Sequence, residues 1–167
     1  MISVAKHLWS LAASKVVIDQ VSGALSFFDI IEEIRFPRES IWDFEAHKKQ
    51  QEKIEEKPVF ALMPFSMMIA SKWVRNDPEI PEKAYCWHKI VSPGGIEIAH
   101  KSHLEIKLRQ QTSSRTLFRS NVFPFDREGV YQITVEYSDR IELNDRQEII
   151  NTDWQRVFSL PVHVSIR

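Results

Sequence analysis

The sequence predicts a mainly β-stranded protein in which two antiparallel sheets pack as a sandwich. Several stretches alternate apolar and polar residues with a period of two, which is typical of half-buried strands. Turn-forming residues separate these stretches, and convincing amphipathic helices are few. Together, these observations predict about seven to eight strands in a single domain over 1–167, with a polar insertion at about 38–57.

The first third of the chain predicts a hairpin. The turn residues of Asp19–Gly23 separate the apolar run Val16–Ile18 from a second run, Ala24–Phe36. Several apolar residues of the second run also have helical spacing. We favour a strand because turn chemistry precedes the run and Phe36-Pro37 ends it.

The segment from Arg38 to Lys57 is rich in charges of both signs and contains neither glycine nor proline. Asp43 is a candidate cap for a short helix. We interpret the segment as a solvated insertion, either helical or mobile, that apolar residues such as Trp42 and Phe44 attach to the domain. The alternative interpretation is a partner-binding segment.

The rest of the chain predicts most of the strands. Pro58–Val74 is apolar on both faces, as expected for a strand that is covered on both sides or for a buried helix. Pro58, Pro64 and the surrounding strands favour the strand. Ile96–Arg109 is predicted as one strand whose even-numbered residues are mostly apolar, and Gly129–Tyr137 and Phe158–Ile166 alternate in the same way.

Four segments resemble a family of small bacterial proteins that is known only as a domain of unknown function. The first is S-G-A-L-S-F-F-D-I-I-E-E-I-R-F-P (22–37), and the second is the S-P-G-G turn (92–95). The others are F-P-F-D-R-E-G-V-Y-Q-I-T-V-E (123–136) and the closing L-P-V-H-V (160–164). The resemblance implies an immunoglobulin-like β-sandwich, and it carries no catalytic residues.

Composition and motifs disfavour several classes of function. The 22 basic and 23 acidic side chains give a formal net charge of −1, without the basic excess that is usual in nucleic-acid-binding proteins. Only four glycines are present, and no dinucleotide-binding, Walker A or nucleophile-elbow motif occurs. We therefore expect no nucleic-acid partner, no cofactor and no enzymatic activity.

The chain is expected to be cytoplasmic. Its one cysteine cannot form an internal disulfide, so nothing indicates an oxidising compartment. Polar residues interrupt the apolar run after Lys6, which makes it a poor signal peptide. No run approaches the roughly 20 apolar residues of a membrane-spanning helix, and no membrane partner is expected.

The stretch Ala84–His103 holds the only cysteine and three of the six histidines, and is the strongest candidate for a metal site. A zinc site needs three or four converging ligands. If a two- or four-residue turn at S-P-G-G pairs the two strands, Cys86, His88 and His103 share a polar face, and His100 points the other way. Even on that face His103 lies too far along its strand to be opposite His88. A hairpin without a metal is therefore favoured, with Cys86 a moderately exposed thiol.

Two of the five tryptophans are further candidates for a binding site. Trp73 and Trp87 fit the core, whereas Trp42 and Trp154 lie near connectors, where an exposed ring can bind a sugar or anchor a partner. We expect a non-catalytic module that binds another protein through a sheet edge or the 38–57 insertion, with homo-oligomers through strand edges also compatible. The alternative is a small-ligand or carbohydrate-binding sandwich. The candidate binding residues are Trp42, Phe44, Trp154, His88 and His103.

Overall fold

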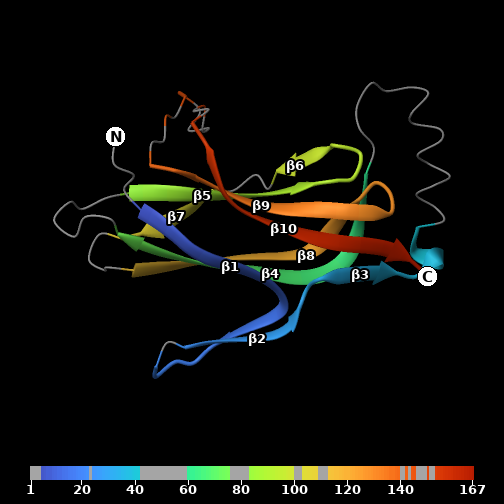
Figure 1. The fold of residues 1–167 in the computed structure, drawn as a ribbon, viewed down its shortest axis with the longest axis horizontal. Helices are drawn as coiled ribbons and strands as arrows, with labels where there is room; N and C mark the ends of the chain where they lie inside the picture. The colour runs from blue at the N-terminus through green and yellow to red at the C-terminus, as the bar shows by residue number, and fades with distance from the viewer. Residues whose placement is uncertain are drawn as a thin grey trace.

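The computed structural model describes residues 5–22, 24–41, 60–75, 83–99, 103–108, 113–139, 142, 144–145, 150 and 153–167. Within these ranges the chain is mainly β, and two sheets pack face to face as a sandwich (Figure 1). The strands are β1 (Ala5–Ile18), β2 (Leu25–Ile30), β3 (Glu33–Phe36), β4 (Ala61–Arg75), β5 (Lys83–Val91), β6 (Glu97–Ala99), β7 (Leu104–Lys107), β8 (Ser113–Phe125), β9 (Gly129–Ser138) and β10 (Gln155–Ile166). The predicted mainly-β sandwich is confirmed. Ten strands are described, more than the seven to eight expected.

The two sheets have simple strand orders. The first is β2-β1-β4-β8, and the second is β3-β10-β9-β5-β6, with β7 also paired to β5. Every pairing is antiparallel except that of β3 with β10, which is parallel. The short β3 therefore forms one edge of the second sheet, beside β10.

The hairpin predicted in the first third is confirmed, and Ala24–Phe36 is extended rather than helical. The chain crosses between sheets where β2 ends. The backbone N–H of Ile31 donates to the carbonyl of Ala12 in β1 at 3.0 Å, and the carbonyl of Glu32 accepts from His163 in β10 at 3.0 Å. Two consecutive residues thus bind opposite sheets, so the apolar run is divided between them as β2 and β3.

The predicted strand over Pro58–Val74 corresponds to β4, which lies between β1 and β8. Trp73 and Met67 are fully buried, and on the same strand Ala70 and Ser71 are also buried. Pro64 lies next to a shift in the pairing of β4 with β8, a position where a missing N–H donor is tolerated.

The segment Ile96–Arg109 differs from its prediction in two respects. It forms two short strands, β6 and β7, which both pair with β5. The predicted register is also wrong, because Ile90 faces Ile98 and Cys86 faces Leu104. The predicted register would have placed these residues on opposite faces.

The cause of the register error is the length of the turn. Val91 faces Glu97, so five residues connect the strands instead of two or four. Ser92 closes this loop: its carbonyl accepts from Gly95 at 2.9 Å, and its hydroxyl accepts from the N–H of Ile96 at 3.2 Å. Gly95 has a φ of 78°, which favours glycine. An odd loop length moves every side chain of the second strand to the other face.

Aromatic side chains pack against one another in two places in the core. At one end Phe36 contacts Phe65, Phe123 and Phe125, at ring-centroid distances of 5.9 to 6.3 Å. At the other, Trp73 stacks on Tyr137 at 5.8 Å. The strands of both sheets therefore contribute to one continuous apolar interior.

The corner between β8 and β9 is built around Tyr131. Its hydroxyl accepts from the backbone N–H of Asp126 at 2.9 Å and lies 2.8 Å from the Asp126 carboxylate. The hydroxyl also donates to the carbonyl of Arg127, at 2.9 Å. One buried phenol thus fixes the turn that aligns β8 with β9 in the other sheet.

Candidate functional site

The predicted grouping of Cys86, His88 and His103 on one face is wrong. Because of the five-residue turn, Cys86 and His88 point into the sandwich and are buried, whereas His103 lies on the outer face. His88 stacks on Phe118 of β8, with 4.9 Å between ring centroids. The sequence suggested His88 as a binding residue on the surface, but its buried ring cannot contact a partner there. Among the described residues, no group of three or more His, Cys, Asp or Glu side chains is placed to hold a metal ion.

Cys86 is fully buried, not moderately exposed as predicted. Its thiol lies 3.5 Å from the hydroxyl of Thr116, which also accepts from the indole N–H of Trp73 at 3.0 Å. Burial raises the pKa of Cys86 to about 12. The thiol is therefore protonated at neutral pH and is a poor nucleophile.

The outer face of β5 carries an aromatic cluster of Trp87, His103 and Trp154. The His103 ring lies 4.6 Å from Trp87 and 5.0 Å from Trp154, on which it stacks, and the two indoles are 5.4 Å apart. Trp87 was expected in the core, and the register change explains why it is on the outer face. The structure thus brings together two predicted site residues, His103 and Trp154, and adds Trp87.

A charged group borders the aromatic cluster. The ammonium of Lys89 lies 2.6 Å from Glu97 and 2.8 Å from Glu136, and 4.4 Å from the centroid of the Trp87 ring. Burial and the positive charge of Lys89 both lower the pKa of His103, so that its imidazole is neutral at neutral pH. The cluster therefore combines ring faces with one ammonium and two carboxylates.

A second candidate surface is the hairpin arm, which we define as residues 14–30 at the ends of β1 and β2. β1 pairs with β4 only up to Ala13, and from Lys15 to Ile18 it pairs with β2 alone. β1 curves at this point, and the hairpin arm turns back beneath it (Figure 1, blue). The ring of Phe27 consequently lies 5.8 Å from that of Trp9. One face of the hairpin arm is turned to the domain and the other to solvent.

The solvent face of the hairpin arm carries three large apolar side chains beside Lys15, whose ammonium lies 5.8 Å from the centroid of the Phe28 ring. Phe28 and Ile30 are 49% and 52% exposed, and Val17, on the same face, is 39% exposed. β2 is the outermost strand of its sheet, so its outer edge pairs with no described strand. An apolar face beside an open strand edge is a typical protein-interaction surface.

Local hydrogen bonds hold both ends of the hairpin arm. At the tip, the Asp19 carboxylate accepts from the backbone N–H groups of Val21 and Ser22 at 3.0 and 2.6 Å, and these bonds lower its pKa. At the base, the Ser14 hydroxyl lies 3.1 Å from both the Phe28 carbonyl and the Asp29 carboxylate. The apolar face is therefore presented on an ordered element, which lowers the entropic cost of binding.

Other predicted site residues are not part of these surfaces. Trp42 and Phe44, with most of the predicted 38–57 insertion, lie outside the described residues. The exposed residues Phe28 and Ile30 were missed because the sequence indicated a hairpin, but not that its second strand lies at the edge of the first sheet. Their apolar character in an edge strand was the available signal.

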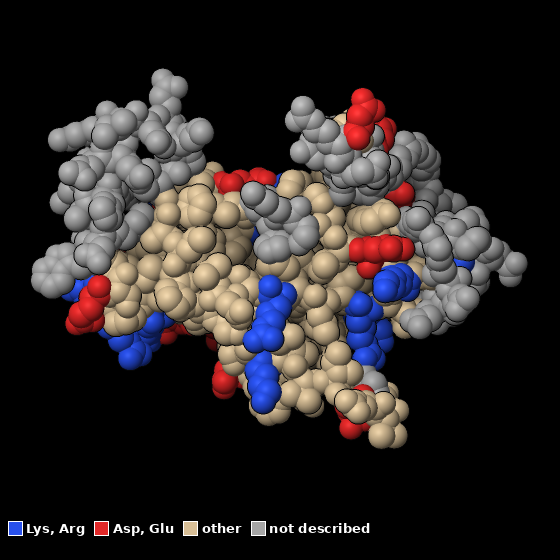
Figure 2. Space-filling model, turned by 180° about the vertical axis from the view of Figure 1, so that it is seen from behind, with Lys and Arg blue, Asp and Glu red and all other residues tan. Residues whose placement is uncertain are grey.

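On the face that Figure 2 shows, the charge is divided into small groups: lysine and arginine side chains lie in ones and twos, with uncharged surface and acidic groups between them. Within the described part of the chain, no helix has the length and apolarity needed to cross a membrane. No family model matches the chain, and no curated protein matches it.

Proposed function

We propose that this protein is a non-catalytic binding module that recognises another protein chain through the open edge of β2. The observation that carries the proposal is the hairpin arm, in which an edge that pairs with no described strand adjoins the exposed side chains of Phe28 and Ile30. An extended segment of the partner would add a strand to this edge, and its apolar side chains would cover these two residues. A second copy of the chain is one such partner and would give a homo-oligomer.

Several features support the wider setting of this proposal. The parallel pairing of β3 with β10 and the Tyr131 corner are features that immunoglobulin-like sandwiches also have, and support that finer assignment. The buried, protonated thiol of Cys86 supports a binding role over a catalytic one. A lone free thiol is also compatible with a reducing cytoplasm. The face in Figure 2 has no large basic patch among the described residues, and so gives no support to a nucleic-acid partner.

The test is a double substitution on the hairpin arm, Phe28→Lys with Ile30→Lys. We expect capture of the partner from the native host to fall by about tenfold or more, because charged side chains would replace the apolar contact surface. The matched control is Leu8→Lys with Val130→Lys, two side chains that are 46% and 47% exposed and lie outside the hairpin arm. Retained capture by the hairpin-arm variant, or equal loss in the control, would contradict the proposal.

The 38–57 insertion is the other partner-binding segment expected from the sequence. Its charged residues lie mostly outside the described residues, so the structure adds no contact to that expectation. Deleting 42–57 separates the two possibilities, because loss of capture in the deletion alone would place the binding surface in the insertion. Loss in the hairpin-arm variant alone assigns it to β2.

A second candidate function is carbohydrate binding at the aromatic cluster. Trp87 and Trp154 offer indole rings, and Lys89, Glu97 and Glu136 offer hydrogen-bonding groups at their border. We expect titration with oligosaccharides to change tryptophan fluorescence in a saturable way, and Trp154→Ala to abolish that change. Trp9→Ala is the control, because Trp9 contacts the hairpin arm instead. A titration without a saturable change would exclude this function for the sugars tested.

A further inference from the structure

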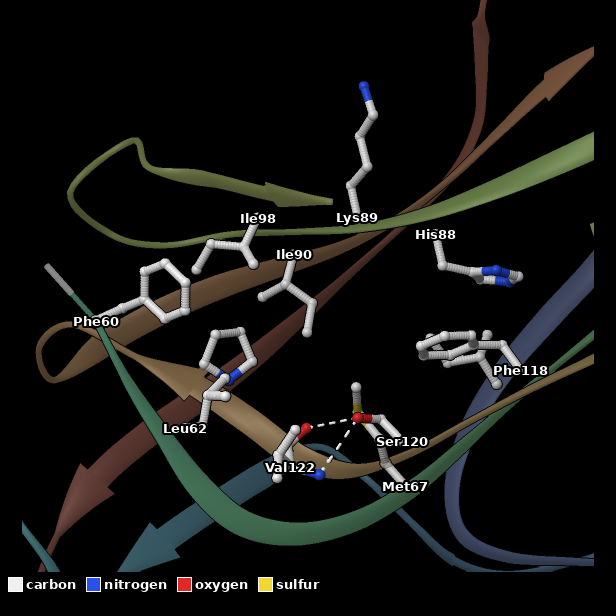
Figure 3. A pocket seen from close by; sticks show the side chains of 12 residues that line it. Phe60, Leu62, Met67, His88, Lys89, Ile90, Ile98, Phe118, Ser120 and Val122 are labelled. Atoms are coloured by element: carbon white, nitrogen blue, oxygen red, sulfur yellow. Dashed lines mark hydrogen bonds between the residues drawn. The ribbon is translucent and has the colours of Figure 1, made fainter. Parts of the chain in front are cut away.

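A pocket of about 520 Å³ lies between the two sheets, lined by no residue of the hairpin arm and sharing only Lys89 with the border of the aromatic cluster. β4 and β8 form one wall, with Met67 and Phe118, and β5 and β6 form the other, with Ile90 and Ile98 (Figure 3). Its volume is within the range of small-molecule sites, about 300–1,000 Å³. An apolar cavity of about 150 Å³ already holds benzene. The interior of a sandwich is normally filled by interdigitated side chains, so this space needs a structural cause.

The cause is a paired irregularity in β4 and β8. Their register shifts between Pro64 and Met67, opposite the segment Ser120–Val122 of β8. There the Ser120 hydroxyl donates to the carbonyl of Val122 at 2.7 Å and accepts from its N–H at 3.3 Å (Figure 3). Before this point the buried residues of β8 have even numbers, such as Phe118, whereas Phe123, Pro124 and Phe125 are all buried after it. The regular alternation of β8 therefore ends where the pocket lies.

Two of the polar side chains in the wall are already engaged. The Ser120 hydroxyl is occupied by Val122, and the Lys89 side chain points away from the pocket, toward Glu97 and Glu136 (Figure 3). The His88 ring lies flat against Phe118 at one end. The remaining lining side chains are apolar, so the pocket offers a hydrocarbon-like surface without a charged group. This surface disfavours sugars and phosphates, whose polar groups would lose their hydration without replacement.

The opposite end of the pocket is open and apolar. Phe60, Leu62 and Val122 are 37%, 60% and 39% exposed, although all three are large apolar side chains that line the pocket. Figure 3 places Phe60 and Leu62 at the far end from His88. A ligand that enters here covers these side chains, and the removal of their apolar surface from water favours binding.

We propose that this pocket binds a fatty acid or a similar single-chain amphiphile, whose hydrocarbon part lies between the sheets and whose polar end lies at the rim formed by Phe60, Leu62 and Val122. The width of the space selects this class of occupant. Packed sheets are about 10 Å apart, so a helix of about 10–12 Å diameter does not fit between them. An extended peptide would bury backbone N–H and C=O groups against side chains that offer them no partners. A fatty acid or a similar single-chain amphiphile has neither difficulty.

The first experiment titrates the full chain with cis-parinaric acid, a fluorescent fatty acid. We expect saturable binding at one molecule per chain, and at least about tenfold weaker binding in Leu62→Asp, because the carboxylate places a charge at the apolar rim. Leu8→Asp is the matched control, since Leu8 is exposed to a similar degree but does not line the pocket. Its affinity should stay within about twofold of the unmodified chain.

Two further variants make the result decisive. Val122→Trp fills the rim with an apolar ring, so it should abolish binding without lowering the melting temperature. Phe28→Lys with Ile30→Lys should leave binding of the fatty acid unchanged, which separates the pocket from the proposed protein surface. Unsaturable binding, equal losses in Leu62→Asp and Leu8→Asp, or full binding by Val122→Trp would each overturn the proposal.

Discussion

Trp73→Ala is expected to lower the free energy of unfolding by about 3–5 kcal/mol, the usual cost of deleting a buried aromatic side chain. Trp73 is fully buried in β4, stacks on Tyr137 and contacts the ring of His7 at 5.0 Å. Its indole N–H donates to the Thr116 hydroxyl, which is itself buried beside Cys86. The substitution therefore creates a cavity and removes the hydrogen-bond donor of a buried hydroxyl.

Urea unfolding measured by circular dichroism tests this expectation. Trp9→Ala is the control, because Trp9 is only partly buried and contacts Phe27 of the hairpin arm. It should cost about 1 kcal/mol or less, as is usual for a substitution outside the core. Similar losses in the two variants would contradict the placement of Trp73 at the centre of the core.

Tyr131→Phe is expected to cost about 2–3 kcal/mol, the second-largest effect. The ring remains in the core beside Phe123, at 5.1 Å, so only the hydroxyl is lost. That hydroxyl serves the backbone of Asp126 and Arg127 and the buried Asp126 carboxylate. Leaving one buried polar group without its partner costs about 1–3 kcal/mol, and here several groups are affected.

The control for this variant is Tyr137→Phe on the same strand. The Tyr137 hydroxyl accepts from the backbone N–H of Ala5 at 3.1 Å, near the beginning of β1. A single hydrogen bond of this kind contributes about 1 kcal/mol. Urea unfolding of both variants should therefore show the larger loss for Tyr131→Phe. A smaller or equal loss would mean that the hydroxyl does not hold the corner between β8 and β9.

Most strands could be predicted because each alternates or is bounded by turn residues. The period-two pattern found β9 and β10, and the apolar run found β4, which lies between β1 and β8, although its residues Leu62 and Pro64 are exposed and the strand is not covered on both faces. Division of Ala24–Phe36 between two sheets was not predictable from its pattern. It depends on the hydrogen bonds that Ile31 and Glu32 make to strands far away in the sequence.

The candidate site was less predictable because it depends on register. The five-residue loop decides which residues of the following strands share a face with Cys86, His88 and Trp87, and nothing local to those residues specifies the loop length. A one-residue error moved Trp87 into the predicted core and Cys86 out of it. The pocket similarly results from a shift between two strands, Pro64–Met67 opposite Ser120–Val122, that no single segment encodes.

The three proposed binding regions can be tested one at a time. The hairpin arm has an open edge with apolar side chains, the outer face of β5 has the aromatic cluster, and the gap between the sheets has the apolar pocket. Each has a substitution that leaves the other two intact. A protein partner and a small apolar ligand are therefore compatible in one molecule.

The most direct test of the proposed function is photo-cross-linking from the hairpin arm in living cells of the native host. The photoreactive residue p-benzoylphenylalanine is placed at Phe28 and, as a control, at Val130, which is exposed to a similar degree on β9. We predict a discrete cross-linked protein from position 28 that is absent from position 130. Absence of a cross-link at position 28, or the same product from both positions, would contradict recognition through β2.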